Sequence, residues 1–332
     1  MRAKKRNKNG LKIFVSILAI LVIGILGYIY SIYANVKDSM DTAYTPVEIE
    51  TFRTMNTGTV ADSSEDEESR ADAGAMTPSE LLEAGEPVSI LLLGVDTGDL
   101  GRTEQGRSDS MVVVTINPHT QKTTLLSIPR DTYTEIVGYG TSDKINHAYA
   151  FGGTAMSINT VQQMLDIPID FYVMVNMAGI QEIVDAVGGI TVESPLAFNQ
   201  NGYDFVQGTN QLDGEAALAF ARMRYEDPAG DTGRQGRQRL VIEAVIRKLA
   251  TPETLLNYQT ILQSLSSNVQ TSFQLSDFYT LQSQDYLGAV DNMNQQQLGG
   301  TGGMMNEIYY NFVDGTELTR VQDLLQAELE LE

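Results

Sequence analysis

Short apolar runs alternate with amphipathic helical patterns between residues 88 and 249. The runs VSILLLGVD, MVVVTIN, TTLLSIP and DFYVMVN are rich in β-branched residues and predict buried strands at 88–96, 111–117, 123–129 and 170–176. Helical patterns predict helices at 153–165, 178–187, 213–225 and 235–249, and 190–193 continues as a strand. Strands that alternate with helices predict an α/β fold whose sheet is covered by helices on both faces.

The N-terminal segment predicts one membrane anchor. Ile13 to Val36 contains no charged residue and is long enough to cross the hydrocarbon core. Basic residues precede it at 1–12, so the positive-inside rule places the N-terminus in the cytoplasm and the remainder outside. The alternative is a cleaved signal peptide, but the apolar run exceeds a typical h-region and no clear cleavage site follows promptly. We therefore predict a cytoplasmic tail at 1–12 and a single-pass transmembrane helix at 13–36 of the cell membrane.

The rest of the chain divides into three parts. Residues 37–87 lose hydrophobic periodicity and include the acidic run DSSEDEESRAD, which predicts an extracellular stalk. Residues 88–250 form the predicted catalytic domain. For residues 251–332 we expect a C-terminal helical extension and an acidic, partly disordered tail, because order is doubtful past about Asn294.

Charge and composition exclude several classes of function. The formal net charge is −21, and the cluster of basic residues at 1–12 leaves the remainder still more acidic, which argues against nucleic-acid binding. The absence of cysteine excludes disulfides, thiol nucleophiles and cysteine-ligated metals, and it suits an exported bacterial-type protein. Two histidines cannot form a multi-histidine metal site. An anionic ligand therefore needs a local basic pocket.

The segment GVDTGDLGRTEQGRSDS at 94–110 is the first candidate site. A buried strand ends at Asp96, and ligand sites of α/β sheets lie beyond the carboxyl ends of strands. Asp96 and Asp109 flank the loop and can converge on one divalent cation, because Mg²⁺ takes few carboxylates and completes its shell with waters and phosphates. The alternative is a surface loop in which these aspartates cap turns.

Arginines mark the second and third candidate sites. Arg130 emerges from the strand end in SIPRDTY, where its planar fork suits phosphate oxygens; the alternative is a surface pair with Asp131. Five further arginines fall within 222–239: Arg222, Arg224, Arg234, Arg237 and Arg239. This concentration in an acidic protein fits a pyrophosphate pocket, and ion pairing with nearby acidic residues is the alternative. We assign His147 a structural role, because no Ser-His-Asp arrangement surrounds it.

Together these motifs resemble the LytR-CpsA-Psr family of Gram-positive cell-wall enzymes. The resemblance rests on LLLGVDTGD, GRSDSM, TLLSIPRDTY, DKINHAYAFGG, IVDAVGGITV and LDGEAALAFARMRYEDPAGDTGRQGRQRLVI, in the family's order and spacing across 88–250. It implies a mixed central β-sheet between helix layers and an apolar pocket for a polyprenyl chain. Apolar residues of 156–187 either line that pocket or form ordinary core.

The resemblance also implies an activity. Family members transfer a phospho-glycopolymer, of wall teichoic acid or capsular polysaccharide type, from a polyprenyl-pyrophosphate carrier to peptidoglycan, forming a phosphodiester. Hydrolysis of the same pyrophosphate is the alternative within enzymology. The non-enzymatic alternative is a regulator that binds polyprenyl lipids without catalysis.

The family's site residues map onto positions of this sequence. Asp96 and Asp109 would hold Mg²⁺ or Mn²⁺. The implied phosphate-binding residues are Arg107, Arg130, Arg222, Arg224 and Arg234, with Gln238 alongside. Arg130, Arg224 and Asp231 are the implied catalytic residues; Asp231 is a candidate general base, although partnership with Arg234 is the favoured alternative. Many members carry arginine two residues after the first aspartate, where this chain has Gly98 followed by Asp99. Either Arg102 takes the place of that arginine in the folded protein, or the phosphate is bound by one hydrogen-bond donor fewer.

Overall fold

The structure is a computed structural model that describes residues 43–47, 53–54, 75–96, 105–251, 268–283 and 285–331. The predicted basic tail at 1–12 and transmembrane helix at 13–36 lie outside these residues. Across the described ranges, no helix combines the length and the apolar character that a membrane crossing requires.

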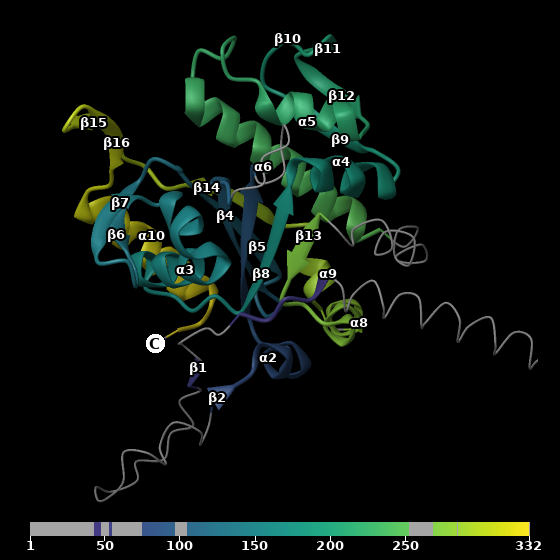
Figure 1. Cartoon of the computed structure of the whole chain (residues 1–332). Coiled ribbons are helices and arrows are strands. Elements are labelled where there is room, and N and C mark those ends of the chain that lie inside the picture. Colours follow the sequence, from purple (N-terminus) through teal and green to yellow (C-terminus); the bar gives the residue numbers. More distant parts are fainter. Residues whose placement is uncertain are drawn as a thin grey trace, which may run out of the picture.

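A six-stranded sheet forms the centre of the molecule (Figure 1). Its order is β13 (Val269–Thr271), β8 (Phe171–Asn176), β3 (Val88–Val95), β4 (Ser108–Asn117), β5 (Lys122–Ile128) and β14 (Met293–Gln297). β8 runs parallel to β3 and β14 parallel to β5, whereas the other neighbours are antiparallel. The expected mixed central sheet is therefore confirmed.

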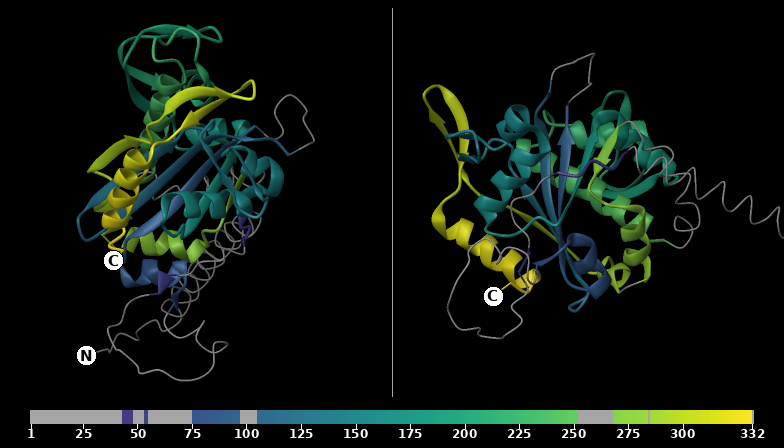
Figure 2. Two further views of the ribbon diagram at one scale, coloured as in Figure 1. Left: turned by 90° about the vertical axis from the view of Figure 1, so that its left-hand side faces the viewer. Right: turned by 60° about the horizontal axis from the view of Figure 1, so that its bottom comes forward.

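Helices cover both faces of the sheet because its central strands are apolar on both sides. Along β3, Leu91 and Leu93 belong to one core cluster and Val88 and Ile90 to another, as the alternation of side chains along a strand requires. The first cluster includes residues of α3 (His147–Leu165) and α10 (Gly315–Glu328). The second packs under α2 (Pro78–Ala84), α8 (Leu275–Ser283) and α9 (Tyr286–Ala289). Figure 2 shows α10 and α8 on opposite sides of the sheet.

A smaller unit, here called the upper lobe, rises above the end of the sheet (Figure 1). It comprises α4 (Met177–Ala186), β9 (Ile190–Ser194), β10 (Phe198–Gln200), β11 (Tyr203–Phe205), β12 (Gly208–Leu212), α5 (Gly214–Arg222) and the first turns of α6 (Gly230–Leu249). β9 pairs with β12, and β10 with β11, both antiparallel. Phe198, Phe205 and Phe220 pack together in a separate core. α6 then runs from the lobe to contact β4 and β5.

The C-terminal segment completes the sheet. β13 and β14 form its two edges, and the hairpin of β15 (Thr301–Met305) and β16 (Ile308–Phe312) precedes α10. We expected a helical extension with a partly disordered tail after residue 250. In the described part of 268–331, the chain instead forms four strands as well as helices, and two of these strands belong to the central sheet. The sequence of β14, MNQQQ, has no alternation of apolar and polar residues, and all five of its residues are only partly buried. Its place in the sheet depends on backbone pairing with β5.

Parts of the predicted stalk pack on the body. The N–H of Thr45 donates to the carbonyl of Thr271, the last residue of β13, at 2.9 Å. β1 (Arg53–Thr54) pairs with β2 (Ala75–Met76), and α2 buries Leu81 and Leu82. A capping box of Thr77 and Glu80 starts that helix. Residues 43–47 and 75–84 are therefore attached to the body rather than held away from it.

The apolar residues of 156–187 contribute to the packed cores. Ile158, Val161 and Leu165 belong to the cluster under α3, and Val184 and Val187 to the core of the upper lobe. Their alternative role as lining of a lipid pocket stays a prediction.

Candidate active site

Two acidic residues and an arginine lie at one end of the sheet, where β3 and β5 finish and β4 begins. Asp96 directly follows β3, and Arg130 follows β5 after one proline. β4 runs in the opposite direction to both, so Asp109, near its beginning, lies at the same edge. The strand directions thus bring together residues that lie on three different segments of the chain.

A β-bulge directs Asp109 into this edge. Val95 pairs with Ser108 and Gly94 with Ser110, which leaves Asp109 as the extra residue. Bulges of this kind redirect a side chain and often occur next to active sites. A Cβ atom on Gly94 would lie 3.0 Å from the Cβ of Ser110, so the close strand approach here favours glycine.

The loop between β3 and β4 is closed at its base by Asp96. Its Oδ1 accepts the N–H of Arg107 at 2.6 Å, and its own N–H donates to the carbonyl of Arg107 at 3.2 Å. Asp96 is therefore fixed by backbone contacts.

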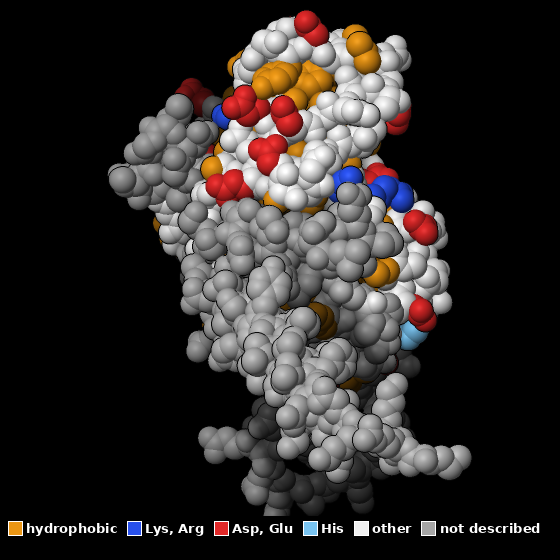
Figure 3. All heavy atoms as spheres, turned by 90° about the vertical axis from the view of Figure 1, so that its right-hand side faces the viewer, with side chains coloured by type: hydrophobic (Ala, Val, Ile, Leu, Met, Phe, Trp, Pro, Cys, Tyr) orange, Lys and Arg blue, Asp and Glu red, His pale blue; other side chains and the backbone are white. Residues whose placement is uncertain are grey.

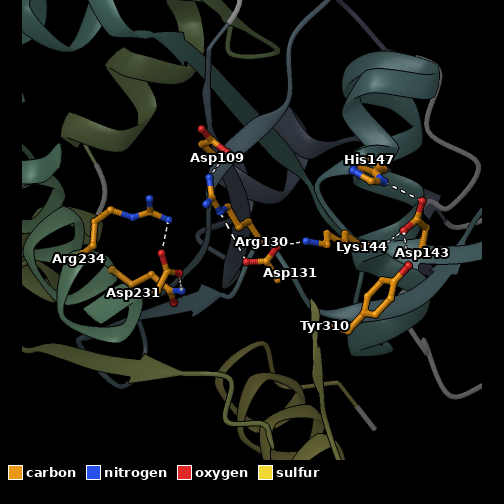
Figure 4. Close-up of polar contacts among 10 residues, drawn as sticks. Asp109, Arg130, Asp131, Asp143, Lys144, His147, Asp231, Arg234 and Tyr310 are labelled. Carbon is orange, nitrogen blue, oxygen red and sulfur yellow. Dashed lines mark hydrogen bonds and ion pairs between the residues drawn. The ribbon is translucent and has the colours of Figure 1, made fainter. Parts of the chain in front are cut away.

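Alternating charges extend from Asp109 along the edge of the sheet (Figure 4). Arg130 Nη1 donates to Asp109 Oδ1 at 2.7 Å, and Arg130 Nε lies 3.7 Å from Asp131 Oδ2. Lys144 Nζ in turn donates to Asp131 Oδ1 at 2.6 Å. These contacts hold Arg130 between two carboxylates.

The upper lobe supplies the second group of charges. Arg222 is the last residue of α5, Arg224 lies in the following loop, and Asp231 and Arg234 lie at the start of α6. Arg234 Nη2 lies 2.5 Å from Asp231 Oδ1, which supports the structural partnership of these residues. Asp231 Oδ2 accepts from Gln235 Nε2 at 3.0 Å. In Figure 3, Lys and Arg side chains gather where the upper lobe meets the rest of the molecule.

Arg237 has a structural role, in agreement with the ion-pairing alternative for this group of arginines. Its side chain is completely buried, with Nε donating to the carbonyl of Phe220 at 3.2 Å and Nη2 to the carbonyl of Met223. Nη1 pairs with Asp227. Arg237 therefore ties α6 to the end of α5 and to the loop that carries Arg224. Arg239 contacts the edge strand β14, where its Nε lies 3.4 Å from Gln295 Oε1.

The charges at this edge influence one another's ionisation. Burial lowers the pKa of Arg234; Asp231 and Asp109 oppose this effect, whereas the neighbouring charges of Arg130 and Arg224 add to it. Burial also disfavours the charged form of Arg130, but the charge and hydrogen bond of Asp109 outweigh it and, with Asp131 and Asp231, raise its pKa. Asp109, Arg130, Arg224, Asp231 and Arg234 therefore form one electrostatic cluster.

This cluster has spare hydrogen-bond donors. Arg130 Nε and Arg234 Nε and Nη2 are buried without a hydrogen-bond partner. The close approach of Arg234 to Asp231 is an ion pair that lacks hydrogen-bond geometry. Buried polar atoms are ordinarily paired, so these donors are suited to the oxygens of an anionic ligand.

Three further predicted phosphate-binding residues are more accessible to solvent than the buried donors of the cluster. Arg107 and Arg222 are exposed, and Gln238 is partly exposed one turn beyond Arg234 on α6. Their binding of phosphate stays a prediction. Gly98, Asp99 and Arg102 lie outside the described residues.

Comparison with known proteins identifies the family. The LytR_cpsA_psr family model matches residues 50–327. The chain belongs to the LytR-CpsA-Psr family. It is 45% identical over 324 residues to the polyisoprenyl-teichoic acid–peptidoglycan teichoic acid transferase TagU of Enterococcus faecalis, covering 97% of this chain and 98% of that protein.

Solved structures of LytR-CpsA-Psr proteins share the fold. The crystal structure of Bacillus subtilis TagU superposes with a TM-score of 0.61 at 42% identity, covering 74% of this chain and 98% of that one. A structure of TagT bound to LI-WTA matches with a TM-score of 0.62 at 30% identity, covering 75% and 92%. These relatives confirm the resemblance seen in the sequence, and the transferase names support the predicted class of enzyme.

The LytR-CpsA-Psr site has a donor set that fits a hard cation. Within the described ranges, no group of three or more acidic or histidine side chains gathers as a metal site. Asp96 and Asp109 nevertheless flank one loop, and two carboxylates are sufficient for Mg²⁺ or Mn²⁺ when phosphate and water complete the shell. Asp109 would share its charge between the cation and Arg130.

Asp143, Lys144, His147 and Tyr310 form a further group of contacts next to Asp131. Asp143 Oδ2 contacts His147 Nδ1 at 2.7 Å, and its Oδ1 accepts the hydroxyl of Tyr310 at 3.1 Å. Lys144 Nζ lies 5.8 Å from the ring centroid of Tyr310. The motif DKINHAY contains Asp143, Lys144 and His147, but nothing in the sequence linked them to Tyr310 of the C-terminal hairpin.

Proposed function

We propose that this chain is a Mg²⁺- or Mn²⁺-dependent transferase for lipid-linked glycopolymers. It moves a phospho-glycopolymer of wall teichoic acid type from a polyprenyl-pyrophosphate carrier to peptidoglycan and forms a phosphodiester. The names of the relatives favour teichoic acid over capsular polysaccharide.

The guanidinium donors that lack hydrogen bonds carry this proposal. Arg130 and Arg234 lie close enough for their charges to interact (Figure 4), and each has at least one buried N–H group without a hydrogen-bond partner beside its ion pair with an aspartate. A pyrophosphate offers several oxygens in a compact anion, and charge-assisted bonds to arginine are among the strongest hydrogen bonds in proteins. A neutral substrate would leave these donors unsatisfied.

In the proposed reaction, the acceptor sugar hydroxyl attacks the phosphorus that bears the glycopolymer. A new phosphorus–oxygen bond forms, the bond to the bridging pyrophosphate oxygen breaks, and polyprenyl phosphate leaves with that oxygen. The hydroxyl proton passes to a base. Arg130, Arg224 and Arg234 bind and orient the phosphates and neutralise the charge on the leaving group. Asp231 orients Arg234, and its role as the base remains the second possibility.

Asp96 and Asp109 would hold the divalent cation. Bound there, it would supply charge neutralisation to the pyrophosphate oxygens. Chelation with EDTA should stop transfer, and addition of Mg²⁺ or Mn²⁺ should restore it. Direct binding can be followed by isothermal titration of Mn²⁺, which should weaken strongly in Asp96→Asn. Unchanged Mn²⁺ binding in that variant would contradict the assigned ligands.

We also propose that residues 13–36 anchor the protein in the cell membrane with the catalytic domain outside. This arrangement would place the site on the side where peptidoglycan lies. Reaction of single cysteines introduced at residues 5 and 200 with a membrane-impermeant maleimide tests it. Labelling of intact cells at residue 5 but not at residue 200 would show the opposite topology and contradict the proposal.

A direct assay tests the transferase. The full chain in detergent is incubated with a synthetic polyprenyl-pyrophosphoryl disaccharide, Mg²⁺ and peptidoglycan glycan oligomers, and products are identified by mass spectrometry. We expect a phosphodiester-linked product and free polyprenyl phosphate. Arg224→Ala should abolish the product. Arg247→Ala is the matched control, because that arginine pairs with Glu243 on an exposed part of α6.

Other results would redirect the assignment. Sugar phosphate released to water despite abundant acceptor would indicate a polyprenyl-pyrophosphate hydrolase. Binding of the lipid without turnover would indicate a non-catalytic regulator. Full activity of Arg224→Ala would refute the arginine cluster as the phosphate site.

A further inference from the structure

Two aromatic side chains form an exposed stack beside the candidate active site. The rings of Tyr139 and Phe151 lie with centroids 4.0 Å apart and planes inclined by 13°. Tyr139 is 52% exposed and Phe151 39% exposed. Large aromatic surfaces in water are unfavourable for a protein without a ligand, and their clustering points to a binding role.

The backbone presents Tyr139 at the tip of a hairpin. β6 (Tyr133–Ile136) and β7 (Thr141–Lys144) are antiparallel, and Tyr139 lies in the turn between them. Gly138 and Gly140 on either side have φ values of +80° and +75°. Such conformations favour glycine, so this turn requires glycines on both sides of the exposed ring.

A helix break presents Phe151. The helical path of α3 is interrupted at Gly152 and Gly153, directly after this residue. A Cβ atom on Gly152 would lie 2.6 Å from Met156 Cε, and Gly153 has a φ of +65°. The break therefore depends on both glycines and turns the first part of α3, with Phe151, towards the hairpin.

A third ring, that of His147, completes the group. It lies 5.6 Å from Phe151 with planes inclined by 57°. Its Nδ1 is held by Asp143, whose other oxygen accepts from Tyr310. This fixes the orientation of the imidazole and leaves Nε2 as the ring nitrogen available to a ligand.

The group is continuous with the phosphate site. Asp143 precedes Lys144, which pairs with Asp131 beside Arg130 (Figure 4). On the other side, Gln105 Nε2 donates to the carbonyl of Tyr149 at 2.6 Å and so joins α3 to the loop closed by Asp96. A ligand on the aromatic stack would therefore be a neighbour of the pyrophosphate.

We propose that Tyr139, Phe151 and His147 form the subsite for a neutral sugar ring of the acceptor glycan. This inference rests on the proposed function, which requires a sugar hydroxyl near the phosphates. A flat aromatic face receives the C–H face of a pyranose, and an oriented imidazole nitrogen exchanges a hydrogen bond with a hydroxyl.

Charge favours the acceptor over the donor polymer. Asp143 lies within the group and Glu135 lies on the adjoining strand β6, whereas the neighbouring Lys144 is already paired with Asp131. The whole chain carries a net charge of −21. A polymer rich in phosphate would be repelled here, whereas an uncharged N-acetylhexosamine ring would not.

Saturation-transfer NMR tests this subsite without the donor. The full chain in detergent is mixed with the N-acetylglucosamine tetramer. We expect Tyr139→Ala and Phe151→Leu to raise the Kd for the tetramer roughly fivefold or more. Phe151→Tyr, which retains a ring, should bind nearly as the wild type does. Tyr279→Ala on α8 is the control for loss of an exposed tyrosine elsewhere.

Kinetics separate the subsite from the phosphate site. In the transfer assay, Tyr139→Ala should raise KM for the glycan acceptor while leaving KM for the lipid donor unchanged. Equal tetramer binding in wild type and Tyr139→Ala would overturn the proposal. A rise in donor KM alone would also overturn it, because the stack would then hold the polyprenyl chain. Tetramer binding that depends on the stack, in a protein that transfers nothing, would retain the subsite and reject the transferase.

Discussion

Arg130, two residues past the end of β5, donates a hydrogen bond of 2.7 Å to Asp109 on the neighbouring antiparallel strand β4. The bond orients the guanidinium before any substrate arrives, and it uses Nη1 while Nε stays without a hydrogen-bond partner. Preorganised donors stabilise developing charge without reorganising during the reaction. The bulge that positions Asp109 therefore also sets the position of the Arg130 guanidinium in the site.

Replacement of Arg130 by lysine should remove activity although it keeps the charge. Lysine presents a point charge and cannot bind Asp109 and a phosphate oxygen through separate fixed N–H groups. We expect kcat to fall roughly 100-fold, with unchanged thermal unfolding of the protein. Steady-state kinetics with the lipid donor measures this. An Arg130→Lys variant with wild-type kcat would show that only charge matters at this position.

Lys144 should act by positioning Arg130. It neutralises Asp131, which otherwise competes with Asp109 for the guanidinium. In Lys144→Met, Arg130 should shift towards Asp131, and kcat should fall roughly tenfold. Lys144→Arg, which keeps a cation beside Asp131, should recover most of the activity. Failure of arginine to rescue would indicate that Lys144 contacts substrate itself.

The buried pair of Arg237 and Asp227 should matter for stability. Arg237→Met leaves Asp227 and two carbonyls without their donor, which should cost about 3–5 kcal/mol of unfolding free energy. Urea unfolding followed by circular dichroism measures the loss. Arg247→Ala, which removes a more exposed pair on the same helix, should change stability by less than about 1 kcal/mol. Similar losses in both variants would contradict the structural role of Arg237.

Acid should weaken the protein partly through Asp227. Burial alone would raise the pKa of Asp227, but hydrogen bonds from Arg237 and from the N–H of Ala229, with the charge of Arg237, lower it. The unfolded chain therefore binds a proton more readily, so this stabilisation is present above about pH 4 and is lost as the pH falls through the lowered pKa. Urea midpoints between about pH 5 and about pH 3 should fall less steeply in Asp227→Asn than in the wild type. If the urea midpoints of the two proteins changed with pH in parallel, Asp227 would not contribute to the loss of stability in acid.

The sequence predicted the central strands well because they are buried on both faces. The expected runs at 88–96 and 123–129 agree closely with β3 and β5. The helix expected at 153–165 corresponds to the part of α3 after the break at Gly152 and Gly153, and the part from His147 was not predicted. α6 begins at Gly230 rather than at 235, and its first turns were missed because they are polar. β14 was missed, since an edge strand of half-exposed amides has no apolar pattern.

Residues at strand ends were also predictable as parts of the site. The sequence placed Asp96 and Arg130 at strand ends and Asp109 across the loop from Asp96, and the strand directions bring all three to the same end of the sheet. The role of Arg237 was not predictable, because it depends on carbonyls that only the folded lobe brings around it. Contacts such as that of Tyr310 with Asp143 join distant segments and leave no local trace in the sequence.

The position of β14 has a consequence for biosynthesis. β5, whose end carries Arg130, is covered on one side by a strand that begins only at Met293. While the nascent chain is being synthesised, β5 keeps an open edge, and such edges recruit strands of other molecules. Newly made copies are therefore most prone to aggregate just before their last segment emerges, and a chain truncated ahead of β14 would stay in that vulnerable state.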